Sequence, residues 1–394
     1  MTAPQLDIAS AQAIVLEHCR ALPSEDLPID EALGLTLAEQ LTAAADVPSM
    51  ANSAMDGFAA QAGDSGRELK VIGESRAGHP SKLTVGPGEA MRISTGAAMP
   101  AGANAVAPIE VVDDAGDTVT LLEVLADGQN VRGAGEDLKA GAEVLADGRE
   151  LGPAELGIAV AAGRAAVSVI RRPRVAVIAT GDELREPGAK LEPGELHDSN
   201  LTTLQAMARA AGAEIVLARQ VGDDPQLTRD SFEEALQSAD VVVCSGGVSV
   251  GPHDHVKGAL SELGVEEHFW RVALRPGRPT WFGSREERLV FGLPGNPVSV
   301  MVTFLLFVAP ALRAIQRRAP QQGLAASLGE PIKRHPDRDE CVRVRLDDGQ
   351  AFATGPQGSH ILSSMALADA LAVIPRGDGE LPAGSAIQLI PLQP

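Results

Sequence analysis

An alternation of short apolar runs and helix-like segments between residues 171 and 319 constrains the fold of this chain most. The run RVAVIAT at 174–180 has an apolar centre, as in a parallel strand that is covered on both faces. The segment SNLTTLQAMARAAG at 199–212 begins with a serine suited to the N-cap and ends with a glycine, so it predicts a helix. EIVLARQV, LTRDSFEEALQSA and DVVVCSGG repeat the alternation. The pattern predicts an open, doubly wound α/β domain.

The segments on either side of this domain have a different texture. Near residues 7–21, helical spacing is shown by Ile8, Ala11, Ile14, Val15 and Cys19, whereas 40–170 and 320–394 consist of short alternating runs between glycines and prolines. A chain of 394 residues is also too long for one ordinary core. We therefore expect a multidomain α/β plus β protein: a helix near 7–21, a β-rich region at 40–170, the α/β domain at 171–319 and a small β domain at 320–394.

The net charge of −20 limits the partners of this chain. Duplex nucleic acid needs a positive field, and with no tyrosine and 3% aromatic residues the chain has little to stack on bases. We therefore expect no nucleic acid. An anionic small molecule would need a local basic cluster or a divalent cation.

The cysteines and the apolar segments indicate the compartment. Three dispersed cysteines without a CxxC pair fit a reducing compartment better than a disulfide framework or a zinc cage. The N-terminus MTAPQLDIAS lacks the features of a secretory signal. The most apolar segment, at 298–312, has 15 residues and contains a proline, so it predicts a buried helix and not a membrane span. We expect a cytoplasmic protein that does not enter the membrane.

Two loops that follow predicted strands have the residues of an anion site. In SGGVSVGPHD at 245–254, Gly246, Gly247 and Gly251 permit positive φ and close approach of the backbone to a phosphate, and Asp254 suits a metal ion or a ring N–H. The alternative is a tight strand-to-helix turn with Asp254 as its cap. In GLPGNPVS at 292–299, an Asn-Pro pair suits the start of a helix whose N–H groups attract anions. An ordinary capped helix is equally compatible with this segment.

Carboxylates follow two other strands. TGDEL contains Asp182 and Glu183, and GDDP contains Asp223 and Asp224. Such pairs hold Mg²⁺ or act as a general base, although a solvated loop and an ordinary helix start are the simpler interpretations. The HDH sequence at 253–255 is a weak zinc pattern, because no further ligands lie nearby.

Basic residues gather in FWRVALRPGRP at 269–279. Arg271, Arg275 and Arg278 carry guanidinium groups that grip oxyanions bidentately, unless glutamates such as Glu266 and Glu286 pair with them. Three further loops, SAMDGFA at 53–59, RISTGAAMP at 92–100 and RGAGEDL at 132–138, carry acidic and hydroxyl side chains. Physical reasoning from the sequence does not connect these loops to the α/β domain.

Taken together, these segments resemble the molybdopterin molybdenumtransferase family, to which the C-terminal domain of gephyrin is similar. The matching segments run in family order: SAMDGFA, RISTGAAMP, RGAGEDL, VAVIATGDELREPG, HDSN, GDDP, SGGVSVGPHD, FWRVALRPGRP, GLPGNPVS and GPQGSHILSSMALAD. The resemblance implies a finer division: a helix at 1–21 that packs on the α/β domain, a linking domain at 22–40 and 140–170, a β-rich insertion at 41–139, a molybdopterin-binding α/β domain at 171–319 and a β domain at 320–394. It also implies a homodimer in which the insertion lies across the partner's cleft. It thereby connects the three outlying loops to that cleft.

The resemblance also implies the reaction and its participants. The reaction is insertion of molybdate into adenylylated molybdopterin, with Mg²⁺ as the implied ion and AMP as a product. Partners would be a molybdopterin adenylyltransferase and molybdoenzymes or their chaperones. The implied catalytic carboxylates are Asp56, Glu183, Asp223 and Asp254, of which the last three would hold the metal. The implied substrate-binding residues are Thr95, Asp137, Gly246, Gly247, Ser249, Gly251, Arg271, Arg275, Pro294, Pro297, Arg343 and Ser359.

Some positions depart from the family pattern. Arginine stands at 271, 275 and 278 where the family usually has lysine, and Phe58 stands where tyrosine is frequent.

Two other functions are alternatives to the molybdenumtransferase. A noncatalytic molybdopterin-binding scaffold is one alternative, and the intact carboxylates argue against it. A molybdopterin adenylyltransferase is the other, and it would need only one α/β domain. Tungstate is an alternative to molybdate, because the two anions have nearly the same size.

Overall fold

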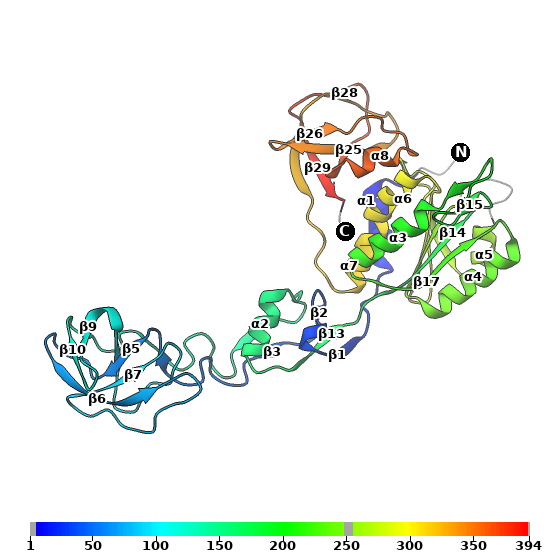
Figure 1. The fold of residues 1–394 in the computed structure, drawn as a ribbon. Coiled ribbons are helices and arrows are strands. Elements are labelled where there is room, and N and C mark those ends of the chain that lie inside the picture. The colour runs from blue at the N-terminus through cyan, green and yellow to red at the C-terminus, as the bar shows by residue number, and fades with distance from the viewer. Residues whose placement is uncertain (1–4, 248–254, 393–394) are drawn as a thin grey trace. The chain divides into compact units, whose positions relative to one another are not determined.

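A computed structural model describes residues 5–247 and 255–392. The chain forms two compact units (Figure 1). Unit 1 comprises Met1–Glu25, Gly34–Thr36 and Ile170–Pro394, and unit 2 comprises Asp26–Leu33 and Leu37–Val169. The α/β and C-terminal β segments of the sequence therefore belong to unit 1, and the β-rich insertion belongs to unit 2.

A six-stranded sheet forms the centre of unit 1 within the described residues. Its order is β17 (Glu214–Val221), β14 (Arg174–Thr180), β18 (Val241–Ser245), β22 (Arg288–Leu293), β21 (Trp281–Arg285) and β19 (Glu266–Trp270). The first four strands are parallel, and β21 and β19 are antiparallel to their neighbours. Helix α3 (Ser199–Ala210) contributes to the core on one face, and α4 (Pro225–Ser238) and α5 (Val256–Glu262) to the core on the other. The predicted doubly wound α/β architecture is confirmed.

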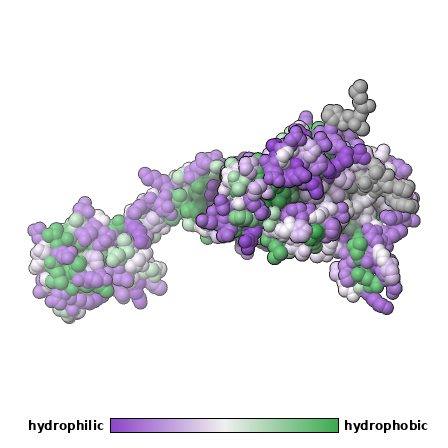
Figure 2. Space-filling model, turned by 90° about the horizontal axis from the view of Figure 1, so that it is seen from above, coloured by the Kyte–Doolittle hydropathy of each residue, from purple (hydrophilic) through white to green (hydrophobic). Residues whose placement is uncertain are grey.

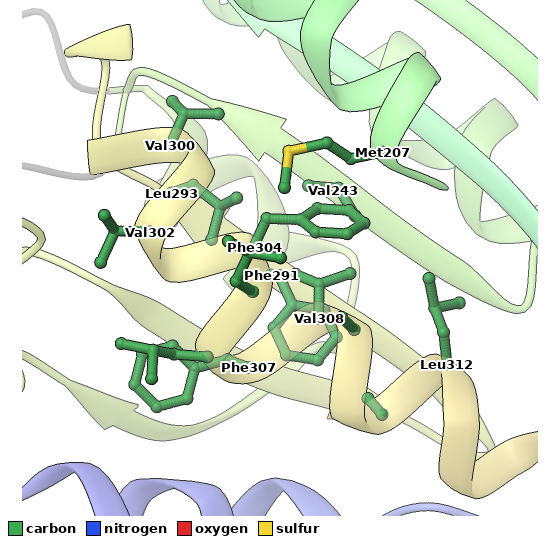
Figure 3. Close-up of a cluster of buried hydrophobic side chains, with 14 of the residues drawn as sticks. Met207, Val243, Phe291, Leu293, Val300, Val302, Phe304, Phe307, Val308 and Leu312 are labelled. Atoms are coloured by element: carbon green, nitrogen blue, oxygen red, sulfur yellow. The ribbon is translucent and has the colours of Figure 1, made fainter. Parts of the chain in front are cut away.

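A long apolar helix fills the first of these cores. It runs through α6 (Pro297–Thr303), a π-helical turn (Phe304–Val308) and α7 (Ala309–Ile315). Among the described residues, this helix alone has the length and apolar character to cross a membrane, but 78% of its most apolar window is buried inside the protein. Phe304 and Val308 pack toward Met207 of α3 and Phe291 of β22 (Figure 3). The predicted buried helix is therefore confirmed.

The N-terminal helix packs on the same core. Helix α1 (Ile8–Glu17) buries Ile8, Ala11 and Val15 of the five residues that the spacing predicted, whereas Ile14 is partly buried and Cys19 follows the end of the helix. At its C-terminal end the His18 ring lies against the His268 ring of β19, with 3.7 Å between centroids. The helix thus shares its core with the α/β sheet.

The C-terminal segment of unit 1 forms a closed sheet. The order is β20 (Leu274–Arg275), β25 (Asp339–Asp347), β26 (Gln350–Ala353), β23 (Leu324–Leu328), β29 (Ala386–Pro391) and β27 (Ala370–Ile374), with β27 also paired to β25. Strand β20 belongs to the α/β segment, so it attaches the C-terminal sheet to that segment and sets Arg275 opposite Glu340. Smaller elements are α8 (Leu362–Ala366) and the pairs β15 (Leu184–Arg185) with β16 (Leu196–His197) and β24 (Ile332–Lys333) with β28 (Glu380–Leu381).

Unit 2 is built mainly from β-structure, as predicted. Its main sheet has the order β8 (Ala105–Pro108), β5 (Gly57–Ala60), β7 (Glu89–Ile93), β6 (Glu68–Ser75), β10 (Thr118–Leu121) and β9 (Val112–Asp114). Its other elements are β11 (Val131–Arg132) with β4 (Asn52–Ser53), β12 (Glu143–Leu145) with β3 (Leu41–Thr42), and α2 (Pro153–Ala161). Phe58 is 1% exposed within the sheet core. Hydrophobic residues also reach the visible face of this unit (Figure 2), and its exposed residues include Ile109, Leu122 and Val124. A further sheet, β1 (Ser24–Pro28), β13 (Ala166–Ile170) and β2 (Thr36–Leu37), is formed where the chain passes between the units.

Candidate functional site

The carboxyl ends of the parallel strands β14, β18 and β22 border a crevice of about 590 Å³. Open α/β sheets bind ligands at this edge, because the loops that leave the strands converge there. The crevice is lined by Glu183, Leu184, Leu196, Asp198, Ser199, Asn200, Gly246, Gly247, Pro279, Pro294, Gly295, Asn296, Pro297 and His360. The loops that the sequence analysis selected after these strands therefore share one cavity.

The glycines after β18 allow the floor of the crevice to form. Gly246 has φ +88° and Gly247 has φ +65°, which confirms the predicted positive values. A Cβ on Gly246 would lie 2.7 Å from the Thr180 carbonyl oxygen, and one on Gly247 would lie 2.3 Å from Val256. Any side chain here would therefore displace a neighbouring element. Ser249, Gly251 and Asp254 lie outside the described residues.

Asp198 supplies the most buried carboxylate of the crevice. It is the N-cap of α3, and its Oδ1 accepts from the Leu201 backbone N–H at 2.9 Å. The predicted serine cap is therefore wrong, because Ser199 is already the first helical residue. Asp198 is 3% exposed, and its Oδ2 is buried without a hydrogen-bond partner among the described residues. Burial raises the pKa of this carboxyl, and the Leu201 and Asn200 N–H groups oppose the shift.

Asn200 holds three walls of the crevice together. Its Nδ2 donates to Ser245 Oγ at 2.8 Å and to the Gly295 carbonyl at 2.7 Å. These bonds join the start of α3 to the end of β18 and to the loop after β22. Asn200 is 9% exposed, so the amide shapes the site from beneath the surface.

The two predicted pairs of carboxylates occupy different positions. Glu183 lines the crevice, whereas Asp223 does not. Asp223 is exposed, and its backbone N–H donates to Asp182 Oδ1 at 2.9 Å. Asp224 caps α4 through the Leu227 N–H at 2.8 Å, which is the simpler interpretation of the GDDP segment.

The loop after β22 forms the opposite wall. Pro294 and Pro297 both line the crevice, and Pro297 is the first residue of α6 as predicted. Asn296 takes the N-cap position by its backbone, but its side chain makes no capping bond. The Val298 N–H donates to the Ser359 carbonyl at 3.1 Å, so one of the N–H groups at the helix start is already occupied.

A second cavity of about 420 Å³ adjoins the crevice, and we call it the arginine pocket. It is lined by Leu274, Arg275, Pro276, Gly277, Arg278, Pro279, Pro294, Asn296, Ser299, Arg338, Gln357, Gly358, Ser359 and His360. Four of these residues also line the crevice, namely Pro279, Pro294, Asn296 and His360. One guanidinium is partly neutralised, since Arg275 Nη1 lies 2.9 Å from Glu340 Oε1.

Arg343 lies behind the arginine pocket and does not line it. It is 1% exposed, and burial lowers its pKa. Its Nε donates to Gln357 Oε1 and its Nη1 to the Gly358 carbonyl, both at 3.0 Å. In this structure Arg343 therefore supports the loop that carries Ser359.

Arg271 lies apart from the other arginines of its segment. It lines neither the crevice nor the arginine pocket. Its guanidinium carbon lies 3.9 Å from the centroid of the Trp270 ring. The cluster that looked continuous in the sequence is thus divided between two places.

Unit 2 brings two of its predicted residues together. Antiparallel pairing of β5 with β7 sets Gly57 opposite Ile93. Asp56 Oδ1 then accepts from the Thr95 N–H at 2.7 Å and from its hydroxyl at 3.1 Å. Asp137 lies on another segment, where its N–H donates to the Val47 carbonyl at 3.0 Å.

The carboxylates of the crevice are suited to one kind of cation. Among the described residues no group of three or more histidine, cysteine or acidic side chains could hold a metal. Mg²⁺ commonly uses one or two carboxylates and completes its shell with waters and substrate phosphates. Glu183 and the unpartnered Oδ2 of Asp198 fit that arrangement.

Four polar residues of the lining that the sequence did not single out are important to the site, namely Asp198, Asn200, Arg338 and His360. The HDSN and GPQGSHILSSMALAD segments contain three of them, but no role had been assigned. Asp and Ser are about equally good N-caps, so the Asp-Ser pair at 198–199 left both positions open as the start of the helix. Arg338 lacked any signal, because only the C-terminal sheet brings it to the pocket.

Comparisons with known proteins cover nearly the whole chain. Residues 6–163 match the MoeA N-terminal region (domain I and II), 176–314 match a probable molybdopterin binding domain, and 325–392 match the MoeA C-terminal region (domain IV). The molybdopterin molybdenumtransferase 2 of Mycobacterium tuberculosis is 37% identical, over 96% of this chain and 97% of its own length. The molybdopterin molybdenumtransferase of Haemophilus influenzae is 34% identical, over 96% and 98%.

A solved structure has the same fold. The molybdopterin biosynthesis MoeA protein of Pyrococcus horikoshii aligns with a TM-score of 0.82 and 30% identity, over 98% of this chain and 99% of that one. A molybdenum cofactor biosynthesis protein of Pyrococcus furiosus, 23% identical over 98% of both chains with a TM-score of 0.62, shares the fold.

Proposed function

Since the chain belongs to the MoeA family of molybdopterin molybdenumtransferases and acts in molybdenum cofactor biosynthesis, we propose a specific reaction for its two cavities. The crevice and the arginine pocket together insert molybdate into adenylylated molybdopterin, and AMP is released. One observation carries the proposal. The two cavities share Pro279, Pro294, Asn296 and His360, so a ligand in one lies against a ligand in the other.

The arginine pocket suits a small tetrahedral dianion. Arg275, Arg278 and Arg338 offer several N–H donors, and Ser299 and Ser359 line the same cavity. Guanidinium groups hold oxyanions by paired, charge-assisted bonds, and hydroxyls add donors around a tetrahedron. In a chain of net charge −20, this local positive charge favours molybdate and offsets its repulsion by the anionic pterin substrate.

The crevice suits the larger substrate. Its glycine floor carries no side chains, so a flat pterin or a phosphate approaches the backbone closely. Glu183 and Asp198 would hold Mg²⁺ together with the substrate phosphates, and Asp254 is a further proposed ligand. When bound, Mg²⁺ would offset the negative charge of the phosphoanhydride. Asp223 lies outside both cavities, so we assign it no contact with substrate.

The chemistry requires protons and water at defined places. Water attacks a phosphorus atom of the phosphoanhydride, and the P–O bond to AMP breaks. Two dithiolate sulfurs form bonds to molybdenum, and an oxide ligand that receives two protons leaves as water. Both protons come from water, because Asp198 Oδ2 would be ionised as a ligand of Mg²⁺.

Unit 2 enters the proposal through a second copy of the chain. We propose a cytoplasmic homodimer in which the Asp56–Thr95 pair of one protomer serves the crevice of its partner. The pair is preorganised, because the Thr95 N–H and hydroxyl fix the Asp56 carboxylate. Molybdopterin adenylyltransferase would supply the substrate, and molybdoenzymes or their chaperones would accept the product.

The direct test is AMP release by the purified protein with adenylylated molybdopterin, Mg²⁺ and molybdate. We expect release that depends on molybdate and falls sharply in Arg278→Met, whereas the matched surface variant Arg288→Met retains it. Equal AMP release with and without molybdate would contradict the insertion reaction.

Subunit sharing is tested by mixing two inactive variants, Asp56→Ala and Arg278→Glu. If each site uses both protomers, exchanged heterodimers contain one intact site, and mixing restores about one quarter of the wild-type activity. No recovery after verified subunit exchange would place both residues in the same protomer's site.

A further inference from the structure

Two cations lie on one indole ring at the edge of the α/β sheet. Lys257 Nζ is 3.3 Å and Arg271 Cζ is 3.9 Å from the centroid of the Trp270 ring. Lys257 and Arg271 come from different elements, α5 and the residue after β19, so only the fold brings them together. Glu267 is a carboxylate close to this pair, with its Oε2 4.0 Å from Lys257 Nζ. We call these two cations and the ring the tryptophan platform.

Strand direction places the platform at the same end of the sheet as the crevice. β19 is antiparallel to β21, which is antiparallel to β22, so β19 runs in the same direction as β22, β18 and β14. Trp270 ends β19 and therefore lies at the same edge of the sheet as the crevice. The Arg271 N–H donates to the Thr280 carbonyl at 2.9 Å, and Thr280 follows Pro279, which lines both cavities.

The backbone holds Arg271 in an uncommon conformation. Its φ is +79°, in the left-handed region that residues with a side chain seldom adopt. Such residues gather at functional sites, where the surrounding structure maintains them. Here the Thr280 bond and the packing on Trp270 maintain it, and Arg271 does not line the arginine pocket.

Stacking leaves the Arg271 donors available for a ligand. An aromatic ring covers the face of a guanidinium, whereas its N–H groups point outward in the guanidinium plane. No hydrogen bond from this guanidinium to another described residue is present, in contrast to Arg275, which pairs with Glu340. Both cations contact the same ring, so an anion at the rim of that ring would be attracted by each of them.

From this arrangement we propose that the tryptophan platform is a second anion subsite, which takes the phosphate groups of the nucleotide-linked substrate while the arginine pocket takes the tetrahedral oxyanion. The identity of the phosphate-bearing ligand rests on the proposed function, and the existence of the subsite does not. Trp270 is a positioning residue in this scheme, because it acts on phosphate through Lys257 and Arg271.

The test uses the full-length chain and inorganic pyrophosphate as the probe. The chain has two tryptophans and no tyrosine, so Trp281→Phe leaves Trp270 as the sole tryptophan reporter. Pyrophosphate should change its emission saturably. Trp281 is a core residue, so its substitution could disturb the fold. Calorimetric titration of the wild-type protein with pyrophosphate therefore repeats the measurement without any substitution.

Substitutions should distinguish pyrophosphate binding at the tryptophan platform from molybdate binding at the arginine pocket. Arg271→Met and Lys257→Met should each weaken pyrophosphate binding about tenfold, the effect of losing one charge-assisted contact, and leave molybdate affinity within about twofold. Arg278→Met should weaken molybdate binding about tenfold and leave pyrophosphate affinity within about twofold. Arg288→Met, which removes the same charge at the amino end of β22, should change neither. Trp270→Phe should retain more pyrophosphate affinity than Trp270→Leu and raise KM for the adenylylated substrate more than it lowers kcat.

Three results would overturn the subsite: no pyrophosphate binding to the otherwise wild-type protein, unchanged pyrophosphate affinity in Arg271→Met, or a larger loss for molybdate than for pyrophosphate in that variant. Pyrophosphate binding through Arg271 in a protein that releases no AMP would retain the subsite and refute the transferase assignment. AMP release by a protein that does not bind pyrophosphate through Arg271 would retain the transferase assignment and refute the subsite.

Discussion

Replacing Gly246 by alanine tests how the floor of the crevice is built. An alanine in the left-handed region costs about 1–2 kcal/mol, and the stiffer unfolded chain returns about 0.4–1 kcal/mol. The new Cβ would also lie 2.7 Å from the Thr180 carbonyl oxygen and 2.9 Å from its hydroxyl. Overpacking of this kind adds about 1–3 kcal/mol. We therefore expect Gly246→Ala to lower the free energy of unfolding by about 2–4 kcal/mol and to reduce AMP release.

Gly264→Ala is the matched control in the same unit. Gly264 has φ +76°, but a Cβ there would meet nothing within 4 Å, so only the backbone cost of about 1 kcal/mol remains. Urea unfolding of both variants measures the difference, and AMP release measures the site. Equal stability of the two variants would refute the conclusion that contact with Thr180 restricts this position.

Three further substitutions probe the buried polar groups. Asp198→Asn should raise stability at neutral pH, since it removes a buried charge, and should lower activity; a fully active, less stable variant would contradict this. Burial and the charge of His18 lower the pKa of His268, so the folded protein resists protonation and should lose stability as pH falls through about 6.5; His268→Gln should flatten thermal stability between pH 7.5 and 5.5. Arg343→Met should cost about 3 kcal/mol and weaken molybdate binding through the Ser359 loop, and unchanged molybdate affinity by calorimetry would show that this loop is not needed.

Local patterns predicted the elements that depend on local forces. The apolar centre of β14, the spacing of Ile8, Ala11 and Val15, and the apolar helix after β22 each appear where the sequence placed them, since burial on one or both faces imposes their periodicity. The positive φ values of Gly246 and Gly247 were also predictable, because glycine has no Cβ and adopts positive φ without steric cost where a strand ends in a tight turn.

Sequence alone predicted the family, the doubly wound domain and the loops at the carboxyl ends of its strands, because each of these features depends on residues that are close together in the chain. Tertiary structure decided which side chains share a cavity. It separated Arg271 from Arg275 and Arg278, although they stand within eight positions of one another, since strand β20 joins a different sheet from β19. It buried Arg343 beneath a loop, and it brought Arg338 and His360 to the pocket from the C-terminal sheet. Such contacts depend on pairing between residues far apart in the chain, which no local pattern records.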